Sequence, residues 1–211
     1  MTQFKFCGLK TPDSVDAAVA AGAGWIGFNF FPPSPRALSP DLARALIQRM
    51  PASVGKVAVL VDPDDALIDA VLAAGCNVLQ FHGAEPPERL AAAKARTGAE
   101  VWRAAGVKTR ADITAAIAAS RSADRLLLDA KASTESGLPG GNGLSFDWRL
   151  LDGMALPGPW GLSGGLDAGN VGAALALLRP AFVDVSSGIE DAPGVKSVFK
   201  IRAFAEAVRA S

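Results

Sequence analysis

Residues 56–81, KVAVLVDPDDALIDAVLAAGCNVLQF, contain a clear indication of the fold. This stretch begins with a β-branched strand pattern at Lys56–Val61 and continues with an alanine- and leucine-rich helical pattern at Asp64–Ala74. A second strand pattern, Asn77–Phe81, follows after three residues or fewer. Two strands joined by a helix predict a parallel pair with a crossover connection.

Residues that start and stop helices support this interpretation. At three predicted helix starts a capping side chain stands directly before a proline, which is favoured at the first helical position: Thr11-Pro12, Ser39-Pro40 and Asp62-Pro63. Gly75 and Gly98 stand where helices are expected to stop.

The same alternation runs over the whole chain of 211 residues. The predicted strands are Phe4–Cys7, Trp25–Phe30, Lys56–Val61, Asn77–Phe81, Glu100–Ala104, Arg125–Asp129, Trp160–Leu162 and Phe182–Val185. The predicted helices are Asp13–Ala21, Pro40–Met50, Asp64–Ala74, Pro86–Thr97, Thr109–Ser120, Asp147–Leu151, Ala168–Leu178 and Val195–Arg209. Eight such units without a linker predict an α/β protein with a single-domain (β/α)8 TIM barrel over residues 1–211. An open doubly wound sheet is the alternative, but it needs fewer strands.

The composition excludes several classes of function. Lys and Arg together number 21, as do Asp and Glu, so the formal net charge is zero and nothing indicates nucleic-acid binding. No segment is long and apolar enough to span a membrane, and the first ten residues lack the apolar core of a signal peptide. One histidine, His82, is too few for a histidine-rich metal site. We therefore expect a soluble cytoplasmic protein that acts on a small molecule.

Two turns of small residues follow the last two predicted strands, and they are Ser163-Gly164-Gly165 and Ser186-Ser187-Gly188. Barrel enzymes often bind phosphate in the loops after strands seven and eight. Small residues let backbone N–H groups approach the phosphate oxygens, and a serine hydroxyl adds a donor. Each could be an ordinary tight turn, but two of them at these strands favour a phosphate site.

Two polar side chains end predicted strands. Cys7 alternates with Phe4 and Phe6, so it faces the barrel mouth if both phenylalanines pack under the helices. It is either a small apolar filler or a catalytic group. Asp129 ends the sixth strand, where it either forms an ion pair with Lys131 or takes part in catalysis, because strand ends on that face supply catalytic residues.

Two charged side chains and one long loop are further candidates for the site, and each has two interpretations. Asp184 lies inside the eighth strand, either in a paired polar layer of the barrel interior or in contact with substrate. Arg36 follows a stretch with three prolines and is either held ready for a carboxylate or solvated. The long glycine-rich segment Lys131–Ser145, which contains Gly141 and Gly143, is either functional or disordered. Because it follows the sixth strand, we expect it on the catalytic face of a barrel.

Several strings of residues resemble the phosphoribosylanthranilate isomerase family. In order they are KFCG at 5–8, FFPPSPR at 30–36, LQFHG at 79–83, LLD at 127–129, GGNG at 140–143, FDW at 146–148, LSGGL at 162–166 and VDVSSG at 183–188. Each string is modest alone, but together they are specific. The resemblance implies a barrel isomerase of tryptophan biosynthesis that converts N-(5-phosphoribosyl)anthranilate to 1-(2-carboxyphenylamino)-1-deoxyribulose 5-phosphate, an Amadori rearrangement.

The resemblance also implies a role for each candidate residue. Cys7 is expected to be the general base, Asp129 the general acid, and Arg36 the group that binds the anthranilate carboxylate. Asp184 is expected to support the sugar hydroxyls or the catalytic groups, and Leu144 stands where we expect a polar residue. The phosphate is expected in the loops that contain Gly141, Gly143, Ser163, Gly164, Gly165, Ser186, Ser187 and Gly188.

These roles require unusual protonation states, because a free thiol has a pKa of about 8.5 and a free aspartic acid one of about 3.9. We expect nearby positive charge, with Lys5 as a candidate, to lower the pKa of Cys7. Desolvation or a neighbouring carboxylate is expected to raise the pKa of Asp129. The iminium of the substrate serves as electron sink, so no metal or cofactor is expected. A barrel that only binds a phosphosugar is the alternative, and either a monomer or a homodimer is compatible with the sequence.

Overall fold

The computed structural model describes residues 2–131, 140 and 143–211. Eight parallel strands in this part of the chain close into a barrel in the order β1 to β8, and β8 pairs with β1. They are β1 (Gln3–Cys7), β2 (Trp25–Asn29), β3 (Gly55–Leu60), β4 (Val78–Phe81), β5 (Glu100–Val107), β6 (Arg125–Ala130), β7 (Trp160–Leu162) and β8 (Phe182–Val185). The predicted barrel is confirmed.

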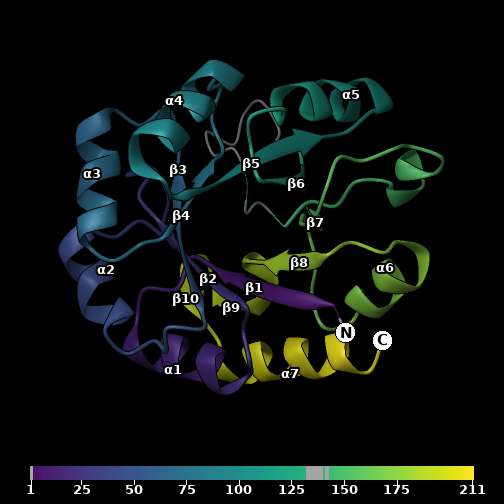
Figure 1. The fold of residues 1–211 in the computed structure, drawn as a ribbon. Helices are drawn as coiled ribbons and strands as arrows, with labels where there is room; N and C mark the ends of the chain where they lie inside the picture. Colours follow the sequence, from purple (N-terminus) through teal and green to yellow (C-terminus); the bar gives the residue numbers. More distant parts are fainter. Residues whose placement is uncertain (1, 132–139, 141–142) are drawn as a thin grey trace.

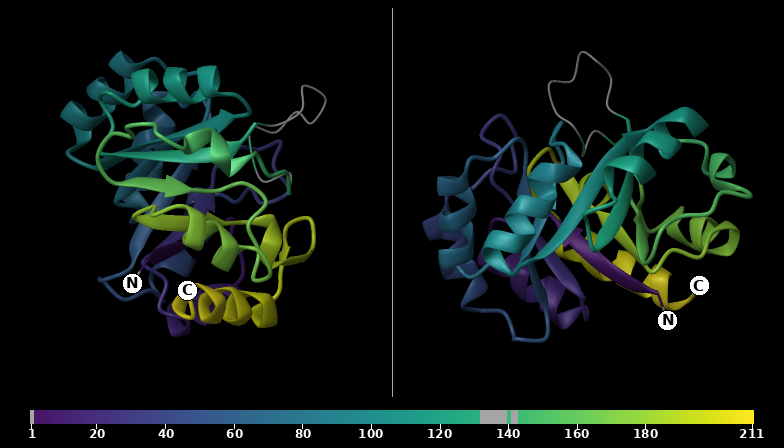
Figure 2. Two further views of the ribbon diagram at one scale, coloured as in Figure 1. Left: turned by 90° about the vertical axis from the view of Figure 1, so that its right-hand side faces the viewer. Right: turned by 45° about the horizontal axis from the view of Figure 1, so that its top comes forward.

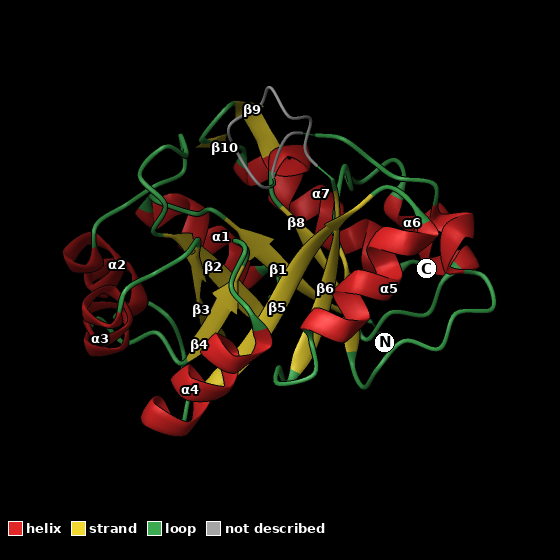
Figure 3. Ribbon diagram, turned by 90° about the horizontal axis from the view of Figure 1, so that it is seen from above, coloured by secondary structure: helices red, strands yellow, loops and turns green. Residues whose placement is uncertain are grey.

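Helices surround these strands on the outside (Figures 1 and 3). In the described residues they are α1 (Pro12–Ala20), α2 (Pro40–Ile47), α3 (Asp65–Ala73), α4 (Pro87–Thr97), α5 (Arg110–Ala119), α6 (Val171–Leu177) and α7 (Val198–Arg209). Because β1 pairs with β8, the start of β1 and the end of α7 lie near each other (Figure 2). None of the described helices combines the length and the apolarity that a membrane span needs.

The side chains of β1 alternate as the sequence predicts. Phe4 and Phe6 are buried under the helices, and the ring of Phe6 lies 6.0 Å from that of Phe204 in α7. Lys5 and Cys7 therefore point to the inside of the barrel. This alternation is what brings the thiol to the barrel mouth.

Large side chains fill the half of the barrel interior that lies at the amino-terminal ends of the strands. Trp25, Trp102 and Phe182 come from three strands, and their ring centroids lie 4.8–5.4 Å apart. Arg125 lies over the Trp25 ring at 5.0 Å. These residues stand at or near the amino-terminal ends of their strands and fill that end of the barrel interior. Barrel enzymes carry their sites at the opposite end, where the strands have their carboxyl ends.

One of the three predicted helix caps is wrong. Thr11 and Ser39 cap α1 and α2 with their side chains, but α3 is capped by Asp64 instead of Asp62. Asp62 has a left-handed backbone (φ 45°), and its N–H donates to Glu85 in the β4–α4 loop at 2.7 Å. The Asp62 carboxylate accepts a hydrogen bond from the Ala84 N–H in the same loop, at 3.0 Å. Asp62 therefore joins two loops, a role that the local sequence does not reveal.

Two predicted helices differ from the structure. Instead of an α-helix at Asp147–Leu151, a single 3-10 turn, Trp148–Leu151, forms, and Gly153 follows it with a positive φ. The helix predicted at Val195–Arg209 begins only at Val198. Its first residues belong to a hairpin of β9 (Glu190–Ala192) and β10 (Val195–Lys196), which turns at Gly194 with φ 78°.

The aromatic filling predicts a large effect of truncation. Trp102→Ala is expected to lower the free energy of unfolding by about 3–5 kcal/mol, because a fully buried indole is lost. Chemical denaturation followed by circular dichroism measures this change. The control is Phe199→Ala, because Phe199 is 79% exposed. This replacement is expected to change the free energy of unfolding by no more than about 0.5 kcal/mol. Equal losses in the two variants would contradict the assignment of this layer as core.

Candidate active site

A cavity opens at the carboxyl ends of the strands and gathers most of the predicted site residues. It is lined by Cys7, Arg36, Asp129, Gly143, Ser163, Gly164, Gly165, Asp184, Ser186 and Ser187 from this set. Gly188 does not line it; it packs against the backbone of Leu166, where a Cβ would overlap the carbonyl. Gly141 lies outside the described residues. The sequence thus predicted a set that the fold largely brings together.

A buried ion pair lies beside Cys7. The Lys5 ammonium is 3.0 Å from both carboxylate oxygens of Asp184, and the Lys5 side chain is fully buried. Asp184 therefore belongs to the paired polar layer that the sequence analysis considered, and it also lines the cavity. Gly27 makes room for this arrangement, since a Cβ there would lie 3.0 Å from the Cys7 sulfur and 3.1 Å from the Lys5 nitrogen.

Lys5 lowers the pKa of Cys7, as expected, but it does not decide the net direction of the shift. Burial, together with the negative charge of Asp184, raises the pKa of the Cys7 thiol above its ordinary value. The charges of Lys5 and Lys196 lower the Cys7 pKa, but they do not outweigh burial. The sequence identified a nearby cation correctly but could not show how far the surrounding atoms remove the thiol from water.

Asp129 has the environment that a general acid needs. Burial and the charge of Asp184 raise the pKa of Asp129 to about 7. The carboxylate accepts hydrogen bonds from the Ala130 N–H at 2.8 Å and from the Ser163 hydroxyl, both of which lower that pKa in part. The alternative of an ion pair with Lys131 is wrong, because the Lys131 ammonium bonds Asp112 at 2.8 Å.

His82 stands next to the proposed acid. Its Nε2 lies 3.6 Å from an Asp129 oxygen, and no described residue forms a hydrogen bond with this nitrogen. Burial and the charges of Lys5 and Arg103 lower the pKa of His82 to about 4, so the imidazole is neutral near pH 7. A neutral neighbour leaves the raised pKa of Asp129 intact. Gly140 closes over this pair, since a Cβ there would overlap both side chains.

Arg36 is buried, so the alternative of a solvated surface arginine is wrong. Its Nε and Nη2 donate to the two carboxylate oxygens of Glu190 at 2.7 and 2.8 Å. Gly8 lies against the aliphatic part of Arg36, and a Cβ there would be 2.7 Å from the arginine Cδ. The guanidinium is thus held in one orientation at the cavity wall. Whether it binds a carboxylate of the substrate stays a prediction.

The predicted phosphate loops meet on one side of the cavity. Gly164 and Gly165 both have a positive φ, 93° and 62°, which favours glycine. Gly165 lies close to the Leu144 backbone, and a Cβ on Gly143 would lie 3.8 Å from the Ser187 hydroxyl oxygen. These loops therefore present backbone and hydroxyl groups to the same space.

Comparison with known proteins decides the family. The sequence profile described as N-(5'phosphoribosyl)anthranilate (PRA) isomerase matches residues 4–207. This chain belongs to that family. It is 50% identical to the N-(5'-phosphoribosyl)anthranilate isomerase of Azorhizobium caulinodans, over 99% of this chain and 92% of that protein. It is 51% identical to the corresponding protein of Paracoccus denitrificans, over 95% and 94%.

Solved structures of the family have the same fold. The phosphoribosyl anthranilate isomerase of Thermotoga maritima matches with a TM-score of 0.88 at 32% identity, and both chains are covered completely. A family structure in complex with reduced 1-(o-carboxyphenylamino)-1-deoxyribulose 5-phosphate matches with a TM-score of 0.85 at 31% identity, again over both whole chains. The resemblance found in the sequence, the barrel and the isomerase activity are therefore confirmed.

Two charged residues at the rim of this cavity were not predicted from the sequence. Glu190 binds Arg36, and the Lys196 ammonium lies 2.8 Å from a Glu190 oxygen. Both follow the loop after β8, which is on the catalytic face. Their opposite charges six residues apart were an available signal, but Lys196 fell within the helix predicted at Val195–Arg209.

The raised pKa of Asp129 predicts a pH-dependent cost in stability. The pKa is about 7 in the folded protein and has an ordinary value of 3.8. A group with a raised pKa stabilises the fold below its unfolded pKa, and this contribution is lost as the pH rises through the folded pKa. Asp129→Asn stays uncharged, so its advantage in stability over the wild type is expected to be larger at about pH 8 than at about pH 5.

Denaturation midpoints in urea at the two pH values measure this difference. Asp41→Asn is the control, because the Asp41 side chain is 89% exposed and its replacement is expected to shift the midpoint equally at both pH values. If the gap between Asp129→Asn and the wild type stayed constant from about pH 5 to about pH 8, the pKa of Asp129 would not be raised.

Proposed function

We propose that this chain converts N-(5'-phosphoribosyl)anthranilate to 1-(2-carboxyphenylamino)-1-deoxyribulose 5-phosphate in tryptophan biosynthesis, with its own residues as acid and base. The observation that carries the proposal is the presence of Cys7 and a protonatable Asp129 in one cavity at the barrel mouth. The reduced compound bound in a solved relative is of the same chemical type as this product.

Asp129 acts first, as the general acid. In its protonated form it donates to the ring oxygen of the furanose, and the C1–O bond breaks to give a protonated Schiff base. A pKa of about 7 suits this step, because a substantial fraction of Asp129 is protonated near neutral pH and its conjugate base can take the proton back. The Ser163 hydroxyl and the Ala130 N–H keep the carboxyl group in place.

Cys7 acts second, as the general base. The positive iminium acidifies the neighbouring C2 proton, and the Cys7 thiolate removes it to give an enolamine, which tautomerises to the ketone. Since burial keeps the thiol protonated in the free protein, thiolate formation depends on positive charge nearby. Lys5 and Lys196 supply part of this charge, and the iminium adds to it when substrate is bound.

Arg36 and the small-residue loops hold the two ends of the substrate. Arg36 binds the anthranilate carboxylate, and its pairing with Glu190 fixes the plane of the guanidinium beforehand. The phosphate is bound by Ser163, Gly164, Gly165, Ser186 and Ser187, with Gly143 nearby. Asp184 keeps Lys5 charged and in place beside the reacting atoms.

We place this reaction in the cytoplasm, without a metal, a cofactor, nucleic acid or a membrane as partner. The iminium of the substrate itself accepts the electrons that proton removal releases. The protein acts as a monomer or as a homodimer. For comparison, the Thermotoga maritima relative is dimeric, and a structure of its monomers is also known.

Loss of either proton-transfer group is expected to remove most of the turnover. Cys7→Ala and Asp129→Asn are each expected to lower kcat by about a hundred- to ten-thousand-fold. The assay follows the loss of phosphoribosylanthranilate fluorescence with purified, chelator-treated protein. Cys76→Ala is the matched control, because Cys76 is the other cysteine and lies outside the residues that line the cavity. Near-wild-type turnover of Cys7→Ala would refute the assignment of the base.

Arg36→Ala is expected to act mainly on substrate binding. A charge-assisted hydrogen bond contributes about 1.5–3 kcal/mol, so KM is expected to rise by about ten- to a hundredfold with a smaller change in kcat. Steady-state kinetics measures both constants. Arg44→Ala, at a half-exposed arginine on α2, is the control and is expected to retain wild-type kinetics. An unchanged KM in Arg36→Ala would place the carboxylate site elsewhere.

A further inference from the structure

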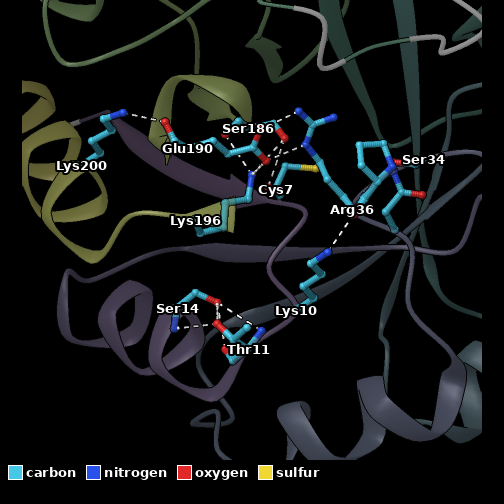
Figure 4. A network of polar contacts seen from close by, with 12 residues as sticks. Cys7, Lys10, Thr11, Ser14, Ser34, Arg36, Ser186, Glu190, Lys196 and Lys200 are labelled. Carbon is cyan, nitrogen blue, oxygen red and sulfur yellow. Dashed lines mark hydrogen bonds and ion pairs between the residues drawn. The ribbon is translucent and has the colours of Figure 1, made fainter. Parts of the chain in front are cut away.

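The β9–β10 hairpin lies against the loop that carries Arg36. At its turn, Gly194 packs on the Pro35 carbonyl, where a Cβ would lie 2.5 Å from the carbonyl oxygen. Lys10 donates to the same carbonyl at 2.8 Å (Figure 4). Glu190 begins the hairpin and Lys196 ends it. The hairpin therefore connects the loops after β1, β2 and β8 at one side of the cavity.

Lys196 points from this hairpin towards the site. Its side chain is 2% exposed, and its ammonium donates to the Ser186 carbonyl at 2.9 Å and to the Ser186 hydroxyl oxygen at 3.2 Å. A third contact reaches Glu190 at 2.8 Å, so all three donors of the ammonium have an acceptor. The Ser186 hydroxyl in turn donates to the Cys7 carbonyl at 3.2 Å. Figure 4 shows these groups around the Cys7 side chain.

The five charged groups around Cys7 on β1, β8, the loop after β2 and the hairpin add up to one surplus positive charge, and Asp129, with a pKa of about 7, lines the same cavity. From β1 and β8 come Lys5 and Asp184, which neutralise each other. From the loop after β2 comes Arg36, and from the hairpin come Glu190 and Lys196. Two cations and one carboxylate in this second group leave a net charge of plus one.

Burial of an ammonium is costly, so packing alone does not account for Lys196. Burial lowers the pKa of Lys196 to about 8, although the negative charges of Glu190 and of the Cys7 thiolate both raise it. An apolar side chain of similar length would fill this space without the desolvation penalty. The charge itself is therefore the property to explain.

We propose that Lys196 is a positioning residue that stabilises the Cys7 thiolate and holds Ser186 beside it. The step concerned is the transfer of the substrate C2 proton to the Cys7 sulfur, during which that sulfur starts as an anion. This inference rests on the proposed role of Cys7 as base. Glu190 shares its carboxylate between Arg36 and Lys196 and thereby links the carboxylate-binding side of the cavity to the thiol.

The test measures the acidity of the thiol without substrate. In a Cys76→Ala background, Cys7 is the single cysteine, and its rate of alkylation by iodoacetamide below about pH 8 is proportional to the thiolate fraction. Lys196→Met, which removes charge and hydrogen bonds, is expected to slow alkylation by about tenfold or more, which corresponds to a rise of one pKa unit or more. Lys196→Gln, which keeps a donor for Ser186, is expected to slow it similarly, and Lys196→Arg to restore much of the rate.

Lys200→Met is the matched control. The Lys200 ammonium also bonds Glu190, through its main-chain carbonyl at 2.6 Å, but it lies on the far side of Glu190 from Cys7 (Figure 4). Its replacement is expected to leave the alkylation rate unchanged. Steady-state kinetics adds a second readout, in which Lys196→Gln lowers kcat with little change in KM.

Two results would overturn the proposal. One is a wild-type alkylation profile in folded Lys196→Gln, which would show that the charge does not act on the thiol. The other is an equal slowing in Lys200→Met, which would indicate a general loosening of the hairpin. Failure of the proposed function is distinguishable, because near-wild-type turnover of Cys7→Ala would refute the base role while leaving the alkylation comparison intact.

Discussion

The ion pair between Lys5 and Asp184 is the interaction on which the rest of the site depends. Closure of the barrel places Lys5 of β1 directly beside Asp184 of β8, 179 residues away in the chain. Both charges are buried, and such a pair is tolerated only when each partner satisfies the other. The pair thereby fixes one cation next to the Cys7 thiol and one carboxylate close enough to raise the pKa of Asp129.

From this pair follow two different environments within one cavity. Asp129 is buried, and it lies near a neutral imidazole and the negative charge of Asp184. It therefore keeps its proton up to about pH 7. Cys7 faces the cations Lys5 and Lys196, which oppose the effect of burial. The proposed two-step proton transfer requires an acid that holds its proton and a thiol whose anion is stabilised by nearby cations.

Contacts between loops hold the rim of the cavity. Arg36 and Glu190 are 154 residues apart, yet their side chains form a two-point pair. The Lys196 ammonium contacts both Glu190 and Ser186, and the Ser186 hydroxyl donates to the main-chain carbonyl of Cys7 at the end of β1. Each contact joins a different loop to its neighbour, so the positions of the groups proposed to bind the carboxylate, to bind the phosphate and to transfer protons are set together.

The barrel, the inward direction of Cys7 and the place of Asp129 near a strand end could be predicted from the amino-acid sequence, because hydrophobic alternation and the order of strands and helices can be read along the chain. The tertiary structure alone decided that Glu190 pairs with Arg36, that Asp62 joins two loops and that residues 190–196 form a hairpin. It also decided the direction of the Cys7 pKa. Burial and charge at a point depend on which distant loops meet there, and no local pattern contains that information.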